Sequence, residues 1–126
     1  MKASIDTNIL IQYIVKSDKK SVDSILEYIK KYDKFIISQP VFLETIFILQ
    51  KKSILSRNEI DEEIFCLLED PLFEFVLEFD IYLFLSLYTS YMSLDITDLY
   101  LLIKSKEIDT LTLDIDLNKK IKSVKF

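Results

Sequence analysis

The sequence contains no histidine and no glycine, and it has a single cysteine among its 126 residues. Without histidine, neither a His-dependent nucleophilic triad nor a His-based acid–base pair can be built. Without glycine, the phosphate-cradling P-loop and the dinucleotide-binding fingerprint are both excluded. A hydrolytic site in this chain would therefore have to be built from other groups.

The cysteine and the hydrophobic runs bear on where the protein works. Because Cys66 is alone, no intramolecular disulfide forms, and a reducing, cytoplasmic setting is expected. Its neighbours Phe65 and Leu67 predict a buried structural thiol rather than a nucleophile. The uncharged stretch 81–94 is shorter than the roughly 20 residues that a membrane span needs, and the N-terminus lacks the pattern of a signal peptide. We therefore expect a protein with neither a membrane span nor a signal peptide.

Charge is unevenly distributed along the chain. The net charge of −5, from 16 basic and 21 acidic residues, argues against a surface coated in positive charge for nonspecific nucleic-acid binding. Half of the residues are hydrophobic, so the composition predicts one folded, soluble domain over residues 1–126. No Lys or Arg lies between Arg57 and Lys104. Lysines cluster instead at 16–20, 30–34, 51–57 and 119–125, which leaves room for a local basic rim.

Strands and helices are predicted to alternate. The alternation favours a parallel sheet covered by helices on both faces. In such sheets, functional sites form beyond the carboxyl ends of the strands. Apolar runs predict strands at 2–6, 34–38, 72–79 and 110–114, with a last edge strand at 124–126. Helical spacing, with Pro40 at a first helical position and Pro71 after a helix end, predicts helices at 7–15, 19–32, 40–52, 57–70, 80–92 and 95–106, and one helical turn at 117–121.

Isolated carboxylates mark four places in this pattern. Asp6 ends the first apolar run, and Glu44 is the only charged residue in the stretch 35–50. Asp98 lies at the start of an apolar helix, and Asp114 ends the fourth predicted strand. A carboxylate in apolar surroundings is costly unless it is paired or binds a cation. All four can reach the same edge of the predicted sheet, which suggests one shared site.

Glu44 and Asp6 each have a structural alternative. Glu44 shares a helix face with Val41, Phe47 and Ile48, which is not the pattern of a solvated face. The alternative is a buried glutamate that is neutralised by a lysine or a backbone donor. Asp6, between a strand and a helix, is equally suited to cap that helix.

The remaining acids carry the same ambiguity. Asp95 and Asp98 are spaced like an N-cap and its N3 partner, so we favour Asp98 as the functional residue and Asp95 as a cap or an outer residue of the site. Asp116 is placed either to assist the site or to cap the short helix that begins at 117. Asp114 is the better site candidate of that pair.

Clustered carboxylates without His or Cys are oxygen ligands for hard cations such as Mg²⁺ or Mn²⁺. Without a cation the acids would repel one another. A bound metal lowers the pKa of its water and stabilises charge on a phosphoryl group. A site with no histidine can therefore still hydrolyse a phosphodiester.

Four segments, in order, resemble the motifs of the PIN-domain nucleases, and within them the small VapC-like toxins of toxin–antitoxin pairs. The resemblance spans essentially the whole chain. IDTNIL (5–10) looks like the opening strand with the first acid, and SQPVFLE (38–44) looks like the second-acid segment. DITD (95–98) and LTLD (111–114) look like the third and fourth. The family's usual glycines, for example before the fourth strand, are missing.

The resemblance implies a three-layer α/β/α sandwich with a parallel, mostly five-stranded sheet. It also implies a Mg²⁺- or Mn²⁺-dependent endoribonuclease, a homodimer, and a small antitoxin protein that blocks the acidic site. By match, the catalytic metal ligands are Asp6, Glu44, Asp98 and Asp114, with Asp116 as a further ligand candidate, while Asn8 and Thr112 support the acids through hydrogen bonds and Asp95 lies next to them.

Two other functions are weighed against this interpretation. Haloacid-dehalogenase-like phosphatases also carry an Asp at a strand end, but they need a second Asp two positions on, where this chain has Asn8. A PIN-like fold retained as an inert RNA-binding or assembly module is the other alternative, and the presence of all four acids counts against it. Transfer, ribosomal and messenger RNA all remain open as substrates.

Partner surfaces are suggested by charge and by apolar residues. Lys16, Lys19 and Lys20 would form a basic rim for RNA, and the acid cluster would accept an Arg from the C-terminal part of an antitoxin. The segment 40–68 holds more large apolar residues than one sheet face buries, so a patch covered by a second copy is expected.

Overall fold

The computed structural model describes residues 1–124 and divides the chain into two compact units, Met1–Glu78 and Phe79–Phe126. Each unit has its own buried apolar residues and is described by itself. The prediction of one domain over 1–126 stays a prediction.

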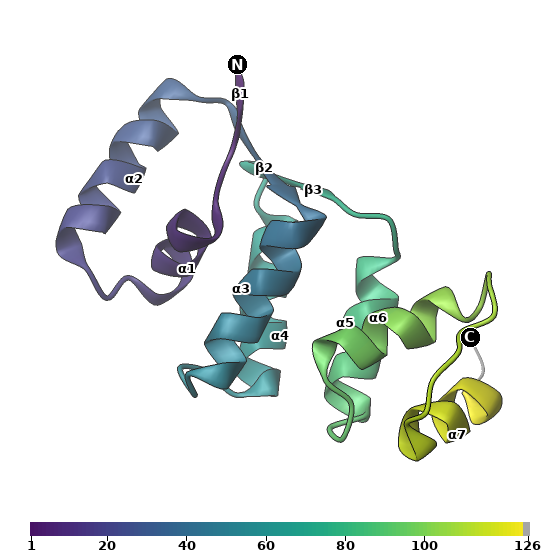
Figure 1. Cartoon of the computed structure of the whole chain (residues 1–126). Coiled ribbons are helices and arrows are strands. Elements are labelled where there is room, and N and C mark those ends of the chain that lie inside the picture. Colours follow the sequence, from purple (N-terminus) through teal and green to yellow (C-terminus); the bar gives the residue numbers. More distant parts are fainter. Residues whose placement is uncertain (125–126) are drawn as a thin grey trace. The chain divides into compact units, whose positions relative to one another are not determined.

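The first unit contains a parallel sheet of β1 (Lys2–Ser4), β2 (Lys34–Ser38) and β3 (Phe73–Val76), paired in that order (Figure 1). Phe35 in the central strand lies opposite Ala3 on one side and Phe73 on the other. The α/β class with a parallel sheet is therefore confirmed. The expectation of five strands is wrong for residues 1–124, which contain three.

Four helices complete this unit. They are α1 (Thr7–Val15), α2 (Lys19–Lys31), α3 (Gln39–Lys51) and α4 (Arg57–Glu69), close to the predicted bounds. Helix α1 packs against α2 and α3, and α3 also packs against α4 and the sheet. Fully buried apolar side chains from helices and sheet form the core: Leu10, Ile37, Phe42, Ile46, Leu49, Ile60 and Ile64.

Local polar contacts hold the helix ends in this unit. Helix α4 begins with a capping box, in which Ser56 and Glu59 each bind the other's backbone N–H. Tyr13 on α1 donates a hydrogen bond of 3.2 Å to the Asp70 carboxylate just beyond α4. Burial, and then the charge and hydrogen bond of Asp70, raise the pKa of Tyr13 above its ordinary value. The first helix is thereby tied to the end of the fourth.

The second unit is built from α5 (Ile81–Ser90), α6 (Ile96–Lys104) and α7 (Ile115–Ser123). Helix α6 packs against both of the others. Phe84 and Tyr88 of α5 stack at 6.1 Å between ring centroids and are fully buried. The core of this unit is thus an aromatic and leucine-rich cluster along α5 and α6.

The C-terminal part of the sequence prediction is wrong in two places. Residues 110–114 are described but form no strand, and Leu111 and Leu113 are almost completely exposed. The Thr112 hydroxyl instead accepts the backbone N–H of Asp114 at 3.0 Å, and such local bonds compete with a strand ladder. Helix α7 is longer than the predicted turn at 117–121 because Asp114 caps it earlier. Of the predicted strand 124–126, Val124 follows α7 without strand structure, and residues 125–126 lie outside the described residues.

Cys66 also differs from its prediction, because it is exposed rather than buried. Helix α4 buries Ile60, Ile64 and Leu67, which recur at helical spacing, and Cys66 lies beside this stripe on the outer side. No helix within residues 1–124 is long and apolar enough to cross a bilayer.

Candidate active site

Asp6 lies where the chain passes from β1 into α1. It is the N-cap of α1 and accepts the backbone N–H of Ile9 at 3.0 Å. The preceding residue, Ile5, is buried and continues the pairing with β2 by donating to the carbonyl of Ile36. Strand pairing on one side and the cap on the other thus hold the Asp6 carboxylate, which is exposed. The capping role weighed from the sequence is confirmed.

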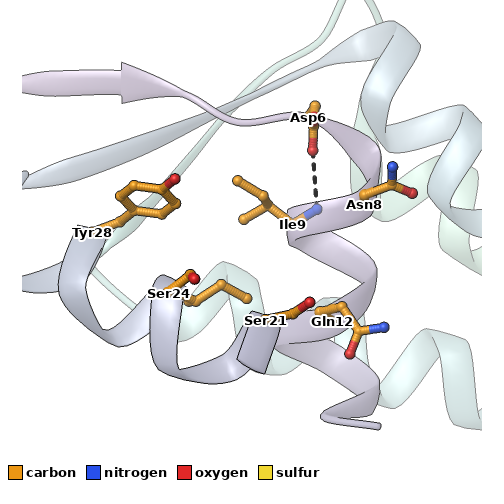
Figure 2. A pocket seen from close by; sticks show the side chains of 8 residues that line it. Asp6, Asn8, Ile9, Gln12, Ser21, Ser24 and Tyr28 are labelled. Atoms are coloured by element: carbon orange, nitrogen blue, oxygen red, sulfur yellow. Dashed lines mark hydrogen bonds between the residues drawn. The ribbon is translucent and has the colours of Figure 1, made fainter. Parts of the chain in front are cut away.

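Asp6 lines a pocket of about 200 Å³ between α1 and α2 (Figure 2). Figure 2 shows Tyr28 and Ser24 rising from α2 towards the side chain of Ile9, with Asp6 above them at the start of α1. Asn8 lines the same pocket, together with Gln12, Ser21 and Ile25. One candidate acid therefore has a polar recess next to it.

Glu44 lies in the second turn of α3, which begins directly after β2. Its side chain is exposed, and it forms no hydrogen bond or ion pair within residues 1–124. The alternative of a buried, neutralised glutamate is wrong. The expected apolar surroundings are also wrong, because Phe47 is 50% exposed and the buried face of α3 consists of Phe42, Thr45, Ile46 and Leu49.

Asp98 is the only one of the four principal acids that is half-buried. It lies in the first turn of α6, and its backbone N–H donates to the Asp95 carboxylate at 2.8 Å. Burial raises the pKa of the Asp98 carboxyl, and the negative charges of Asp95 and Asp114 raise it further, while a backbone hydrogen bond at Asp95 partly offsets this rise. The carboxylates of Asp95 and Asp114 therefore both act unfavourably on the charged form of Asp98.

Asp114 and Asp116 lie at the start of α7. Asp114 caps the helix by accepting the Leu117 N–H at 3.0 Å, so the cap proposed for Asp116 belongs to Asp114 instead. Asp116 accepts a hydrogen bond of 3.0 Å from the Ser93 hydroxyl. Thr112 holds the backbone of Asp114, as described above. Ser93 was not singled out from the sequence, where a serine 23 residues away gives no signal.

The structure thus places the acids in two groups. Asp6 and Glu44 follow neighbouring parallel strands of the first unit, and Asp98 and Asp114 lie together in the second. Within residues 1–124, no three acids converge closely enough to hold a metal ion. The single four-acid site expected at one sheet edge therefore stays a prediction.

The sequence interpretation also missed the polar wall of the Asp6 pocket. Ser21, Ser24 and Tyr28 recur at spacings of three and four residues, so they lie on one face of α2. The sequence interpretation of α2 used only its apolar face, at Val22, Ile25 and neighbouring positions. Their helical spacing was the signal that could have revealed this second, polar stripe.

The donor chemistry fits a hard divalent cation. Every candidate ligand is a carboxylate oxygen, which Mg²⁺ and Mn²⁺ prefer. The unfavourable charge around Asp98 is what a cation would relieve, and the Glu44 carboxylate is uncommitted within the described residues. By their donor chemistry the candidate acids are therefore suited to a hard cation, while within residues 1–124 no three of them lie close enough together to form a ligand set.

Comparison with known protein families identifies a match. The family model of the PIN domain matches residues 3–122, nearly the whole chain and all of the candidate acids. No curated protein and no solved structure matches the chain significantly.

Proposed function

Because the chain belongs to the PIN domain family, whose members are generally nucleases, we propose that it is a Mg²⁺- or Mn²⁺-dependent endoribonuclease. We further propose that it is the toxin of a toxin–antitoxin pair. The nuclease proposal is supported by four acids in segments that resemble the family's motifs, and by the pKa of Asp98, which burial and then the nearby charges of Asp95 and Asp114 raise. An inert module would have no use for such unfavourable charge.

Asp6, Glu44, Asp98 and Asp114 would hold the metal, with Asp116 as an additional ligand. Bound there, the ion supplies a water of lowered pKa and neutralises charge that develops on the phosphoryl group. Asp6 and Asp114 each use one carboxylate oxygen as a cap, which leaves the other for the site. Because the chain has no histidine, the carboxylates are also the groups that would accept a proton from the attacking water.

RNA binding requires positive charge that the acids do not provide. Lys16, Lys19 and Lys20 are all exposed around the turn between α1 and α2, next to the pocket that Asp6 lines. The αL conformation of Lys16, with φ of 56°, ends α1 and reverses the chain there. A phosphate backbone would be attracted to this rim, in a manner that depends on salt.

An antitoxin and a second copy are the proposed protein partners. An Arg from the antitoxin would pair with the acids when the metal is absent. For the second copy, the proposed surface is an apolar patch made by Phe47 of α3, Ile54 of the loop that follows and Phe65 of α4, which are 38–50% exposed. Other large residues of the segment 40–68, such as Phe42 and Ile64, are buried in the first unit instead.

Cleavage of mixed RNA by the purified protein tests the function. We expect cleavage with Mn²⁺ or Mg²⁺ and none with excess chelator, because without a cation nothing lowers the pKa of the attacking water. Asp98→Asn is the matched inactive variant, and Asp109→Asn, an exposed acid outside the site, is the control for a lost charge. Equal cleavage with metal and with chelator would refute the mechanism, and absence of cleavage with either metal would favour the inert module.

A further inference from the structure

One face of α7 holds the short loop between α5 and α6. The Asp116 carboxylate accepts a hydrogen bond of 3.0 Å from the Ser93 hydroxyl, and the Lys120 ammonium lies over the ring of Tyr91, 5.1 Å from its centroid. Positions 116 and 120 are four residues apart and therefore lie on the same side of α7. Helix α7 thus presents an acid and a base to this loop, and all of these residues belong to the second unit.

The same loop leads directly to the candidate acids of this unit. Asp95 follows the loop closely and caps α6, where it accepts the Asp98 N–H at 2.8 Å. Asp114 caps α7, which packs against α6. The charges of Asp95 and Asp114 both act on Asp98, so the starts of α6 and α7 lie close together. Lys120 is therefore held at the loop that leads into the acids.

Lys120 and Asp116 do not pair with each other. An acid four residues before a lysine is a favourable arrangement for an ion pair along a helix. Within residues 1–124, neither side chain takes part in an ion pair, and the Asp116 carboxylate binds Ser93 instead. The Tyr91 ring attracts the Lys120 ammonium but does not cancel its charge. A half-buried lysine that keeps its full charge therefore lies beside the loop.

Positive charge is scarce in the second unit. Its lysines occur only from Lys104 onwards, and three of them lie on α7, namely Lys119, Lys120 and Lys122. The helix dipole favours lysines in a last turn, which accounts for both Lys120 and Lys122. The dipole does not account for the contact of Lys120 with Tyr91, which belongs to another element and holds the ammonium at the loop.

A cation at this place has a use in binding RNA. Every nucleotide of a single strand carries a negative phosphate, which neighbouring carboxylates repel. A lysine held close to the acids offsets this repulsion and fixes where the backbone lies. Because lysine meets a phosphate as a point charge, such a contact positions the strand without reading its sequence.

We propose that Lys120, which lies over the Tyr91 ring, binds the phosphate backbone of single-stranded RNA beside the acids of the second unit. The proposal rests on the proposed ribonuclease function and assigns one of its substrate contacts to α7. Lys120 is a substrate-binding residue in this proposal, and Tyr91 holds its side chain in place.

The salt dependence of RNA binding tests the contact. Fluorescence anisotropy of end-labelled oligouridine is recorded in chelator over a series of NaCl concentrations, so that binding is measured without cleavage. One phosphate contact contributes about 0.7 to the slope of log affinity against log salt on a single strand, which is about fivefold in affinity between 1 M and 0.1 M salt. Lys120→Met removes the charge and keeps a flexible apolar side chain against the Tyr91 ring. We expect its slope to fall by about 0.7 and its affinity at 0.1 M salt to fall about fivefold, whereas Lys120→Arg should keep both.

Lys104 provides the matched control. It lies in the last turn of α6, is half-buried, and places its ammonium 5.8 Å from the centroid of the Tyr100 ring on its own helix. Lys104→Met therefore loses the same charge and the same kind of contact away from the loop between α5 and α6, and should bind with the wild-type slope and affinity. Circular dichroism and thermal unfolding establish that the variants fold, and Lys120→Gln, another good helix former, replaces Lys120→Met if that variant does not.

Cleavage with Mn²⁺ supplies a second measurement. A contact that is made equally in the bound substrate and in the transition state affects KM and leaves kcat unchanged. We therefore expect Lys120→Met to raise KM about fivefold, with kcat within about twofold of the wild-type value. A fall in kcat at unchanged KM would overturn the assignment of Lys120 as a binding residue.

The outcomes separate Lys120 from the nuclease. Equal salt slopes in wild type and Lys120→Met, or equal falls in Lys120→Met and Lys104→Met, in a protein that still cleaves RNA with Mn²⁺, would overturn the role of Lys120 alone. A slope reduced only in Lys120→Met, without any metal-dependent cleavage, would support the RNA contact and refute the nuclease. If the wild type does not bind RNA in chelator, the contact is overturned whether or not cleavage occurs.

Discussion

Asp6 has two roles to separate, a helix cap that the structure shows and a metal ligand that we propose. The Asp6 carboxylate accepts the Ile9 N–H at 3.0 Å, and an asparagine side chain can accept the same bond. Asp6→Asn therefore keeps the cap and removes the charge, whereas Asp6→Ala removes both. Asp80 is the matched control, because it caps α5 in the same way, through Tyr82 and Leu83, and is not a candidate ligand.

The expected magnitudes follow from these contacts. Loss of an Asp cap to Ala costs about 1 kcal/mol, whereas Asn caps about as well as Asp. With an unfolding entropy of roughly 2.1 cal/mol/K per residue over 126 residues, 1 kcal/mol lowers Tm by about 4 °C if the chain unfolds together. We therefore expect Tm to fall by about 4 °C in Asp6→Ala and Asp80→Ala, and by about 2 °C or less in the Asn variants. Removing a metal ligand should cost about 3 kcal/mol or more in the transition state, which is about 100-fold or more in rate.

Thermal unfolding and RNA cleavage with Mn²⁺ at 25 °C would be measured on the four variants together. Asp6→Asn should be stable and inactive, and Asp80→Ala should be destabilised and active. If Asp6→Asn cleaves RNA at the wild-type rate, Asp6 is only a cap and our assignment of the first ligand is refuted. A large fall in Tm for Asp6→Asn would instead show that the carboxylate stabilises α1 through its charge.

Three further outcomes are expected. Glu44→Gln should keep wild-type Tm, because Glu44 is exposed and has no partner within the described residues, and should lose RNA cleavage; retained cleavage would remove it from the ligand set. Hydrogen bonds from the backbone N–H and then the hydroxyl of Ser56 lower the pKa of the Glu59 carboxyl in the folded chain. The unfolded chain therefore binds a proton at Glu59 more tightly than the folded chain does. The stabilisation by ionised Glu59 is complete above the pKa of the unfolded chain and is lost as pH falls through the pKa of the folded chain. The Tm difference between wild type and Glu59→Gln should therefore shrink between pH 7 and pH 3, and a constant difference would contradict the capping box. Light scattering at micromolar concentration should give a dimer for the wild type and a monomer for Phe65→Ser, and a monomeric wild type would refute the proposed patch.

Elements of the first unit were predicted well because local patterns determine them. Helix α1 and strand β2 have the predicted bounds, and α3 begins at Gln39, one residue before the predicted start at Pro40. Helix starts are set by side chains that are visible in the sequence, such as Ser56 and Glu59. In these cases the signal and the structure that it specifies lie within a few residues of each other.

Burial was predicted less well, because it depends on which neighbour covers a face. The face of α3 that carries Glu44 also carries Phe47, and apolar neighbours alone indicated a covered surface. The opposite stripe, from Phe42 to Leu49, has the same helical spacing and is the one that packs. Cys66 was misplaced for the same reason, since its sequence neighbours say nothing about which side of α4 meets the core.

The strand predicted at 110–114 is wrong for a further reason. The alternation of Leu111, Thr112 and Leu113 is typical of a strand, but a strand also needs a partner for its backbone groups. Thr112 provides one partner locally by accepting the N–H of Asp114. Local side-chain competition of this kind is invisible to a hydrophobic pattern.

The alternatives of cap or ligand, which the sequence posed for each aspartate, are not exclusive once the hydrogen bonds are known. Asp6, Asp95 and Asp114 all cap helices, each through one carboxylate oxygen, so a second oxygen remains on every one of them. A helix N-terminus also carries partial positive charge, which offsets part of the repulsion among clustered carboxylates. Asp98 lies in the first turn of α6, where the partial positive charge of the helix N-terminus favours its ionised form. Burial and the charges of its acidic neighbours nevertheless raise the pKa of Asp98. In the second unit the helix ends therefore make neighbouring acids tolerable, and the repulsion that remains around Asp98 is the reason to expect a cation.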